Sequence, residues 1–247
     1  METFTDTKSY GIFSNAANRK IINDLEESGA KVFLFPVIET EAVERAENIE
    51  FINANLSQTD WLIFPDVFSV DYFLEIMEKC EIELFKIDEK RVLTFGEAIA
   101  DRLRFSQIHA DIIPNSIESD ESFSALQEYL QTETVEDLRF FIPVFRGFEN
   151  DFVRKLKDKG AEVFESEIFT LKYPFDNKIA KLKALLSGGA VDEFVFTAPD
   201  DVFSLTQYVF PASIKAILQE VKCFATNEIT MQTLHESGIV SKYFQTK

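Results

Sequence analysis

Residues that typically build metal centres, disulfide frameworks and membrane spans are scarce in this chain. Its 247 residues include only two cysteines and two histidines. Cys80, Cys223, His109 and His235 stand apart, without the short spacings of a metal site or a disulfide framework. No apolar run approaches the roughly 20 residues that a membrane helix requires, and the start METFTDTKSY lacks a secretory-signal pattern. We expect reduced thiols, no metal, no membrane partner and a cytoplasmic location.

Positive charge is also in short supply. The 25 lysines and arginines face 43 aspartates and glutamates, which gives a formal net charge of −18. Nucleic-acid binding depends on clustered cations, so we expect no nucleic-acid partner. A polyanionic substrate would need the few cations to gather in one place. The chain contains neither Gly-x-Gly-x-x-Gly nor Gly-x-Ser-x-Gly, which argues against a dinucleotide site and a serine hydrolase.

Two related stretches organise what the chain does contain. Asp60–Val70 reads DWLIFPDVFSV, and Asp192–Leu205 reads DEFVFTAPDDVFSL. Each is a short apolar run that a proline interrupts and that continues with helical spacing of apolar residues. Such a run, bounded by turn residues, is typical of a strand buried on both faces. The pattern therefore predicts a strand, a tight turn and a helix, twice.

Further matches at a nearly constant offset indicate a duplicated α/β protein. SGAKVFLFP, from Ser28, matches KGAEVFESE, from Lys159. The separations are similar: 160 − 29 = 131 for the glycines of these segments and 196 − 64 = 132 for the phenylalanines that end the two apolar runs. VLTFGEAIADRL, from Val92, likewise resembles KCFATNEITMQTL, from Lys222. In open α/β sheets, ligands bind at the carboxyl ends of the strands, so the turns there are the candidate site.

The apolar runs predict ten strands, each followed by a turn or a helix. Between them, Thr40–Asn55 is acidic, and we expect it to be helical or irregular around Ile49–Ile52. The strands are expected to begin near Tyr10, Lys31, Trp61, Arg91, Asp111, Arg139, Glu162, Glu193, Lys222 and Val240.

Several of these turns carry residues that resemble a known family. The two equivalent strands end in Phe64-Pro65-Asp66 and Phe196-Thr197-Ala198, and a third runs into Phe95-Gly96-Glu97-Ala98-Ile99-Ala100. An Arg146-Gly147 turn opens the second half. In their order and spacing these motifs resemble uroporphyrinogen-III synthases, and the likeness covers nearly the whole chain.

The resemblance implies two flavodoxin-like α/β domains, each a parallel five-stranded sheet flanked by helices, with a cleft between them. In that family the chain leaves the first domain after its second strand and later returns to complete it. Here the crossings would lie near Val37–Thr40 and Thr170–Pro174. The first domain would be residues 1–36 plus 171–247, and the second residues 37–170.

The resemblance also implies an activity. Enzymes of this family close linear hydroxymethylbilane into uroporphyrinogen III, with loss of water and inversion of the last pyrrole ring. They need no cofactor, so we expect none here. The expected partner is a small linear tetrapyrrole, and we expect the protein to be a monomer.

Main-chain N–H groups at helix N-termini, together with hydroxyl groups and an arginine, suit a substrate with many carboxylates. The strand-end turns are therefore the expected substrate-binding positions. They comprise Ser14, Asn15, Pro65, Asp66, Gly96, Glu97, Ala98, Arg146, Gly147, Thr197, Ala198, Pro199, Thr226 and Asn227.

The chain departs from the family at the position of a tyrosine thought to assist departure of the hydroxyl. Counting from the second-half glycine, this position is Phe169, and Tyr173 is the nearest substitute. Asp66 and Asp200 add carboxylates where small neutral residues are usual, and such groups would repel the substrate unless protonated or turned outward. One alternative is therefore an inactive, synthase-like module that binds a tetrapyrrole or a protein partner. A two-lobed binder of small solutes is a further alternative, against which the missing signal segment argues.

Overall fold

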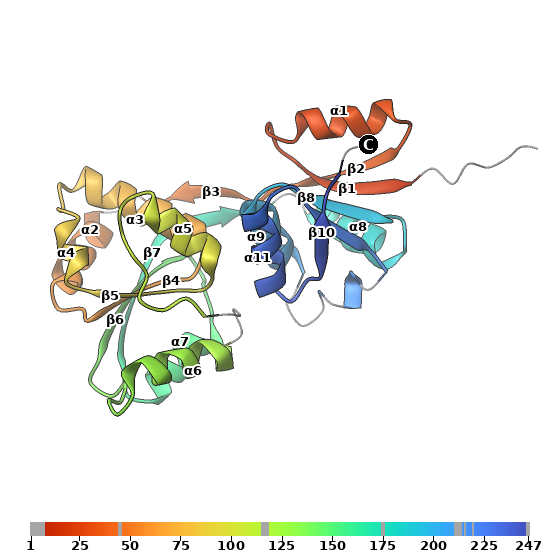
Figure 1. Cartoon of the computed structure of the whole chain (residues 1–247). Coiled ribbons are helices and arrows are strands. Elements are labelled where there is room, and N and C mark those ends of the chain that lie inside the picture. The colour runs from red at the N-terminus through yellow and green to blue at the C-terminus, as the bar shows by residue number, and fades with distance from the viewer. Residues whose placement is uncertain are drawn as a thin grey trace, which may run out of the picture. The chain divides into compact units, whose positions relative to one another are not determined.

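The computed structural model describes residues 8–43, 46–114, 119–173, 176–209, 214, 216–218 and 220–245 (Figure 1). Internal contacts divide the chain into two compact units. Unit 1 comprises Met1–Glu39 and Tyr173–Lys247, whereas unit 2 is the continuous segment Thr40–Lys172. Each unit contains one five-stranded sheet. The predicted α/β class, with two mostly parallel sheets flanked by helices, is confirmed.

Sheet A, in unit 1, has the strand order β10-β9-β8-β1-β2. All of its strand pairings are parallel. In Figure 1, α1 lies on one face of this sheet, and α8, α9 and α11 lie on the other. The elements are β1 Ser9–Ser14, α1 Arg19–Glu27, β2 Lys31–Pro36, α8 Asp176–Ser187, β8 Glu193–Phe196, α9 Pro199–Tyr208, β9 Lys222–Ala225, α11 Glu228–Glu236 and β10 Ser241–Tyr243.

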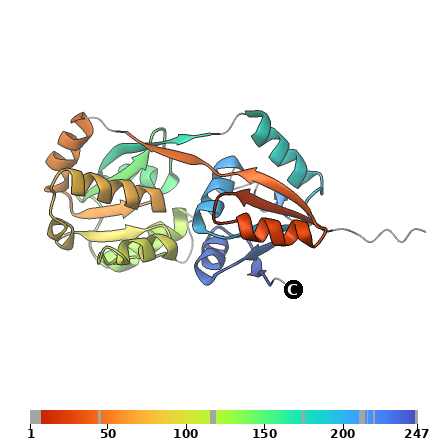
Figure 2. The same ribbon diagram turned by 90° about the horizontal axis from the view of Figure 1, so that it is seen from above.

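Sheet B, in unit 2, has the order β3-β7-β6-β4-β5. Figure 2 shows β4 and β5, in orange and yellow, pointing the same way. The strands are β3 Glu39–Ala42, β4 Trp61–Phe64, β5 Arg91–Thr94, β6 Arg139–Phe145 and β7 Glu162–Lys172. The helices are α2 Ala46–Leu56, α3 Val67–Lys79, α4 Phe85–Asp88, α5 Glu97–Arg104, α6 Ser119–Leu130 and α7 Asp151–Asp158.

The two sheets share one topology, as the repeated sequence predicts. Sheet A read from β2 runs β2-β1-β8-β9-β10, which is the flavodoxin-like order 2-1-3-4-5 along the chain. Sheet B read from β7 runs β7-β6-β4-β5, and a parallel bridge between Leu93 and Ile112 continues it in the fifth position. Strands β1, β2, β8 and β9 thus correspond to β6, β7, β4 and β5.

Sheet B differs from the sequence prediction at both of its edges. Beside β5, the strand expected at Asp111–Ile113 is reduced to the single bridge at Ile112. At the opposite edge, beside β7, the sheet has the additional strand β3, in a segment expected to be helical or irregular. Its sequence ETEA lacks the apolar alternation that would have predicted a strand. Its side chains make polar contacts: Tyr72 donates a hydrogen bond to Thr40, and Lys172 pairs with Glu41 at 2.9 Å.

Aromatic side chains pack closely around the central strands of sheet A. In sheet A, Phe194 on β8 lies opposite Gly11 on β1, and its ring packs against Phe13, Phe35 and Phe196. A Cβ atom on Gly11 would lie 2.6 Å from the Phe194 ring. Glycine is therefore required here by close packing, not by backbone conformation.

Candidate functional site at the carboxyl ends of the strands

In unit 1, the turn after β8 is linked to the turn after β1. The Thr197 hydroxyl lies 2.5 Å from Asn18 Oδ1 and 2.9 Å from Asp201 Oδ2. Asn15 Nδ2 donates to Asp201 Oδ1 at 3.3 Å. Asn18 is fully buried, and its amide donates to the Phe13 carbonyl at the end of β1. The predicted residues Asn15 and Thr197 are thus brought together at the point where the strand order reverses.

Asp201 organises this turn, although the sequence prediction did not name it. Its carboxylate is fully buried and accepts hydrogen bonds from the main-chain N–H groups of Thr197 and Ala198, at 2.8 and 3.3 Å. Burial raises the pKa of Asp201, and these donors oppose the rise. The sequence signal was present: an acid three residues after the N-cap Ala198 is the second half of a capping box. Asp200, expected to face the site, is exposed, and Pro199 begins α9.

The turn after β9 joins the same group. Asn227 Nδ2 donates to the Thr197 carbonyl at 2.8 Å, and the Thr226 hydroxyl reaches the same oxygen at 3.3 Å. Asn227 also caps α11 by accepting from the N–H of Thr230. Both predicted residues therefore border the Thr197 turn.

The start of α1 carries two cations that the prediction missed. Ser14, at the end of β1, is exposed, and α1 begins at Arg19 without a side-chain cap on its N–H groups. The first turn of α1 contains Arg19 and Lys20, both exposed, and no acidic residue. Cations are unfavourable beside the positive end of a helix dipole, and an anion bound there would relieve the repulsion.

In unit 2, the turn after β4 holds a buried carboxyl group. Asp66 follows Pro65 and caps α3: its Oδ1 accepts from the Ser69 N–H at 2.7 Å, and the Ser69 hydroxyl donates to the Asp66 carbonyl. Within the described part of the chain, Asp66 Oδ2 is buried without a hydrogen-bond partner. Burial raises the pKa of Asp66 to about 7.

The turn after β5 leads directly into α5. Gly96 is its N-cap, with φ 131°, and α5 begins without a side-chain cap. Ala98 is buried, whereas Glu97 is turned along the helix, where it pairs with Arg104 at 2.7 Å. The first N–H groups of α5 therefore have no competing side chain from their own cap.

The Arg146-Gly147 turn follows β6 and is tied to β7. Arg146 Nε lies 3.5 Å from Glu167 Oε2, and the Gly147 N–H donates to Glu167 Oε1 at 3.2 Å. The main-chain N–H of Arg146 donates to the Phe169 carbonyl. About half of the arginine side chain is exposed. This cation is thus present at the turn, but it is already partly neutralised.

The position expected to carry a catalytic tyrosine is part of the core. Phe169 is fully buried, and its ring stacks on Tyr72 with centroids 5.0 Å apart. Tyr173, the expected substitute, belongs to unit 1 and is 51% exposed. Partial burial of its ring raises the pKa of Tyr173. Burial, and to a lesser extent the nearby Tyr173, raise the pKa of Tyr208. The Tyr208 hydroxyl donates a hydrogen bond to the Pro36 carbonyl at 3.0 Å.

The described residues contain no cluster of three or more histidine, cysteine, aspartate or glutamate side chains suited to a metal ion. None of the helices in this part of the chain is long and apolar enough to cross a membrane.

Together, these features define a duplicated α/β protein with anion-compatible turns at the carboxyl ends of two mostly parallel sheets. Its fold is similar to that of the Thermus thermophilus uroporphyrinogen III synthase, with 19% identity, a TM-score of 0.67 and coverage of 96% of this chain and 93% of that one. A wild-type structure of the synthase from the same organism, in a second crystal form, gives 20% identity, a TM-score of 0.67 and coverages of 96% and 92%.

The family itself is shown by the sequence. Residues 19–246 match the family model described as uroporphyrinogen-III synthase HemD. The chain belongs to the uroporphyrinogen-III synthase family, as its motifs indicated, and the reaction of that family is the synthesis of uroporphyrinogen III.

Proposed function

We propose that this protein closes linear hydroxymethylbilane into uroporphyrinogen III and that it holds the substrate carboxylates on main-chain N–H groups at the strand ends. The expected substrate-binding turns are those that contain Ser14, Asn15, Gly96, Arg146 and Thr197, together with their neighbours. Helix N-termini attract anions through aligned N–H groups and the helix dipole. This mode of binding needs no cofactor and tolerates wide variation of side chains.

The observation that carries the proposal is the contrast among helix starts. Among the described helices, α3, α7 and α11 are capped by Asp66, Asn150 and Asn227. Helices α1 and α5 follow β1 and β5 without such a side-chain bond. Their first N–H groups are the ones that a substrate carboxylate would satisfy. At α1, Arg19 and Lys20 would add charge.

The acidic side chains of these turns are compatible with an anionic substrate. Asp201 is bonded within its own turn, and the raised pKa of Asp66 keeps part of its population neutral near pH 7. Glu97 and Glu167 are paired with arginines. The repulsion expected from Asp66 is thereby reduced, whereas the exposed Asp200 remains beside the Thr197 turn.

Departure of the substrate hydroxyl as water needs a proton on that oxygen. We propose Tyr173 as the donor, because it is 51% exposed and a tyrosine hydroxyl is protonated at neutral pH. The electron-rich pyrroles stabilise the cation that remains. The protein then has to orient the last ring for inversion and closure.

The remaining expectations belong to this proposal. They are a cytoplasmic location and a monomeric state. The acidic overall charge, −18, is unfavourable for nucleic-acid binding.

The test is an assay with enzymatically generated hydroxymethylbilane that separates the type III product from the type I isomer, which forms without catalysis. We expect mostly type III. Only type I from protein with a cooperative unfolding transition would overturn the proposal.

Two tyrosine variants test the proton donor. Tyr173→Phe should lower kcat for type III product about 10²-fold with little change in KM. Tyr243→Phe is the matched control, since Tyr243 is similarly exposed, at 48%, but lies on β10. Equal rates for both variants would remove Tyr173 from the mechanism.

A further inference from the structure

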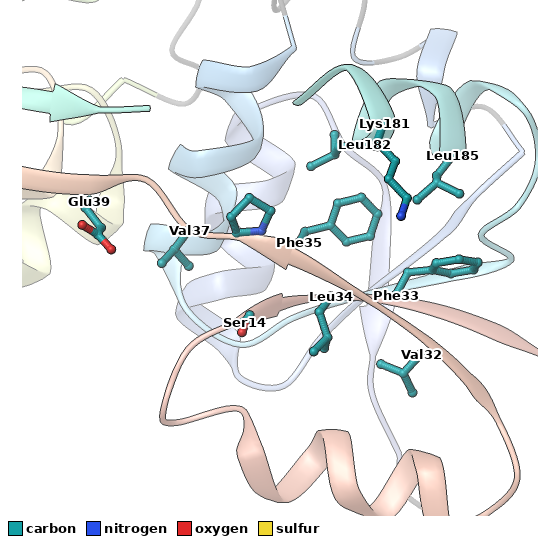
Figure 3. Close-up of a pocket in the computed structure, with 11 residues that line it drawn as sticks. Ser14, Val32, Phe33, Leu34, Phe35, Val37, Glu39, Lys181, Leu182 and Leu185 are labelled. Atoms are coloured by element: carbon teal, nitrogen blue, oxygen red, sulfur yellow. The ribbon is translucent and has the colours of Figure 1, made fainter. Parts of the chain in front are cut away.

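A groove of about 500 Å³ runs along the outer edge of β2 in unit 1. Figure 3 shows Phe33 and Phe35 on the side of α8, and Val32 and Leu34 on the opposite side of the strand. Neighbouring residues of a strand point to opposite faces, so a space lined by both sets lies beside the strand edge. This is the place that a further strand of sheet A would occupy.

The main chain of β2 has hydrogen-bonding groups directed toward this space. The N–H of Lys31 donates to the Lys8 carbonyl next to β1, so the alternation of the strand turns Val32, Leu34 and Pro36 the other way. Among the described strands, β2 is the last one of sheet A on this side. Pro36 has no N–H, and its carbonyl accepts from Tyr208. Val32 and Leu34 therefore offer two donors and two acceptors to an added segment.

The equivalent place in unit 2 holds an aromatic ring, which is 38% exposed. Helices α8 and α2 align with an offset of 130, because Leu182 and Ile52 (182 − 52) are both buried core residues. At the same offset, Lys181 corresponds to Phe51 (181 − 51 = 130), whose ring lies 6.4 Å from Phe164. In unit 1, α8 thus has a lysine beside Phe33 where α2 of unit 2 has a phenylalanine that contacts Phe164.

The strand edge differs as well. In sheet B, β3 lies beside β7, whereas in sheet A no described strand lies beyond β2. Leu34 corresponds to Glu165 of β7 (165 − 34 = 131), and Glu165 pairs with Lys157. Leu34 is apolar and 53% exposed, so β2 has neither a charge at this position nor a neighbouring strand to discourage the addition of a further strand.

The groove also carries positive charge in a strongly acidic protein. Lys181 reaches from α8 toward β2 (Figure 3), and the Lys31 ammonium lies 4.6 Å from the centroid of the Phe33 ring. Glu39 lines the far end. With a net charge of −18, most of the surface would repel an acidic segment, whereas this edge would attract it.

We propose that the edge of β2 binds an extended, acidic segment of a partner protein by strand addition. Its main chain pairs with Val32 and Leu34, and its carboxylates face Lys181 and Lys31. An aromatic side chain of the segment fills the space that Phe51 fills in unit 2. Strand addition uses main-chain bonds for affinity and adjacent pockets for specificity.

A second copy of this chain fits the edge less well. In an antiparallel pair of β2 strands, Val32 of one copy would bond Leu34 of the other, and Pro36 would limit the ladder to these residues. Each copy would also bring its own Lys31 and Lys181 to the shared edge. Like charges at a short distance oppose that pairing.

The test uses the full chain and a labelled, end-blocked peptide, Glu-Val-Glu-Phe-Glu-Val-Glu, followed by fluorescence anisotropy. We expect saturable binding. Replacing every glutamate by lysine, or methylating alternate amide nitrogens, should weaken binding at least tenfold, which corresponds to about 1.4 kcal/mol. Equal binding of the lysine peptide, or no binding of the acidic one, would overturn the proposal.

Variants locate the site. Lys181→Glu and Leu34→Glu should each weaken peptide binding at least tenfold, because the first reverses a charge of the groove and the second places a carboxylate, as at Glu165, beside the added segment. Lys181→Phe should abolish binding while raising the melting temperature, since the groove is then filled as in unit 2. Lys242→Glu, on the opposite edge strand β10, is the control and should leave the affinity unchanged.

Formation of type III product reports separately on the synthase, and the groove variants should retain it. Sedimentation velocity tests whether a second copy of this chain occupies the edge of β2. A dimer that Leu34→Glu dissociates would assign the edge to a second copy and overturn the proposal.

Discussion

The turns after β4 and β8 occupy equivalent places in the two units, yet they position their carboxyl groups differently. In unit 2 the acid is the N-cap, Asp66, and its partner three residues later is Ser69. In unit 1 the N-cap is Ala198, and the acid is the later residue, Asp201. The same short strand-to-helix connection therefore accepts a carboxylate at either end of the capping box. The choice of end decides how well that carboxylate is satisfied.

Asp201 is the better satisfied of the two. Both of its oxygens accept hydrogen bonds, including one from Asn15 in another turn. Asp66 uses Oδ1 for Ser69, while Oδ2 is buried without a partner within the described residues. An unsatisfied oxygen favours the protonated form, so burial dominates the pKa of Asp66. In unit 1 the Asp201 carboxylate is held by hydrogen bonds within the turns, whereas in unit 2 the Asp66 carboxyl group has a pKa of about 7.

The largest effect should come from removing the satisfied carboxylate. Asp201→Ala leaves the N–H groups of Thr197 and Ala198 and the Asn15 amide without their acceptor. We expect a loss of about 4 kcal/mol in the free energy of unfolding, measured by urea denaturation. Asp200→Ala is the neighbouring exposed control and should change it by less than about 0.5 kcal/mol. Similar losses for both variants would show that the buried contacts contribute little.

The second prediction concerns the pH dependence of Asp66. Its folded pKa, about 7, lies above the ordinary value near 3.8, so the folded state binds this proton more tightly. The free energy of unfolding should therefore fall as pH rises from about 4 to 7. Asp66→Asn retains a cap without a titrating proton, and relative to wild type it should gain roughly 3 kcal/mol over that range.

Urea denaturation at a series of pH values measures this gain. Asp24→Asn, at an exposed position of α1, is the control and should show no such trend. A gain for Asp66→Asn that does not depend on pH would contradict the assignment.

The third prediction tests whether the small residue Gly11 and the large residue Phe194 depend on each other in the core of unit 1. Gly11→Ala would place a Cβ atom 2.6 Å from the Phe194 ring, and overpacking of this kind should cost about 2 kcal/mol. In unit 2, Leu62 takes the place of Phe194 (194 − 62 = 132). The double variant Gly11→Ala/Phe194→Leu should therefore be more stable than the sum of the two single changes predicts. Strict additivity in a double-mutant cycle would reject this coupling.

The smallest predicted effect compares the helices that follow β1 and β6. Helix α7 is capped by Asn150 and has Asp151 in its first turn, whereas α1 is uncapped and begins with Arg19 and Lys20. If anion binding belongs to α1, Arg19→Ala/Lys20→Ala should raise KM for hydroxymethylbilane about tenfold, or about 1.4 kcal/mol. Thermal stability should change little.

The control for this pair removes two exposed cations elsewhere in sheet A, with Lys222→Ala/Lys242→Ala. An equal rise in KM for both double variants would point to long-range charge and away from a local site.

Much of the fold could be predicted from the sequence, because buried parallel strands leave continuous apolar runs. WLIF and EFVF, which became β4 and β8, are of this kind. Strand β3 could not be predicted in this way. Its residues ETEA resemble a solvated turn, and its place in sheet B depends on contacts with Tyr72 and Lys172, which are distant in sequence.

The candidate site was less predictable. The turns could be located, because a strand end followed by a helix is visible in the pattern. Whether each side chain is exposed or buried could not be predicted. Asp200 is exposed and Asp201 is buried, although they are adjacent aspartates. Phe169 similarly proves to be a core residue stacked on Tyr72. Its neighbours along the chain give no indication of that contact.

The division of the chain also fixes an order of assembly. Unit 2 is continuous in sequence, whereas unit 1 joins β1 to β8 across 183 residues, as in the hydrogen bond from Ser9 to Asp192. During synthesis, at about 5–20 residues per second, β1 and β2 leave the ribosome before unit 2 but lack their central partner until β8 follows. Unit 2 has all of its strands by then. Synthesis in this order therefore allows unit 2 to bury its core before β1 and β2, although these two strands are made earlier.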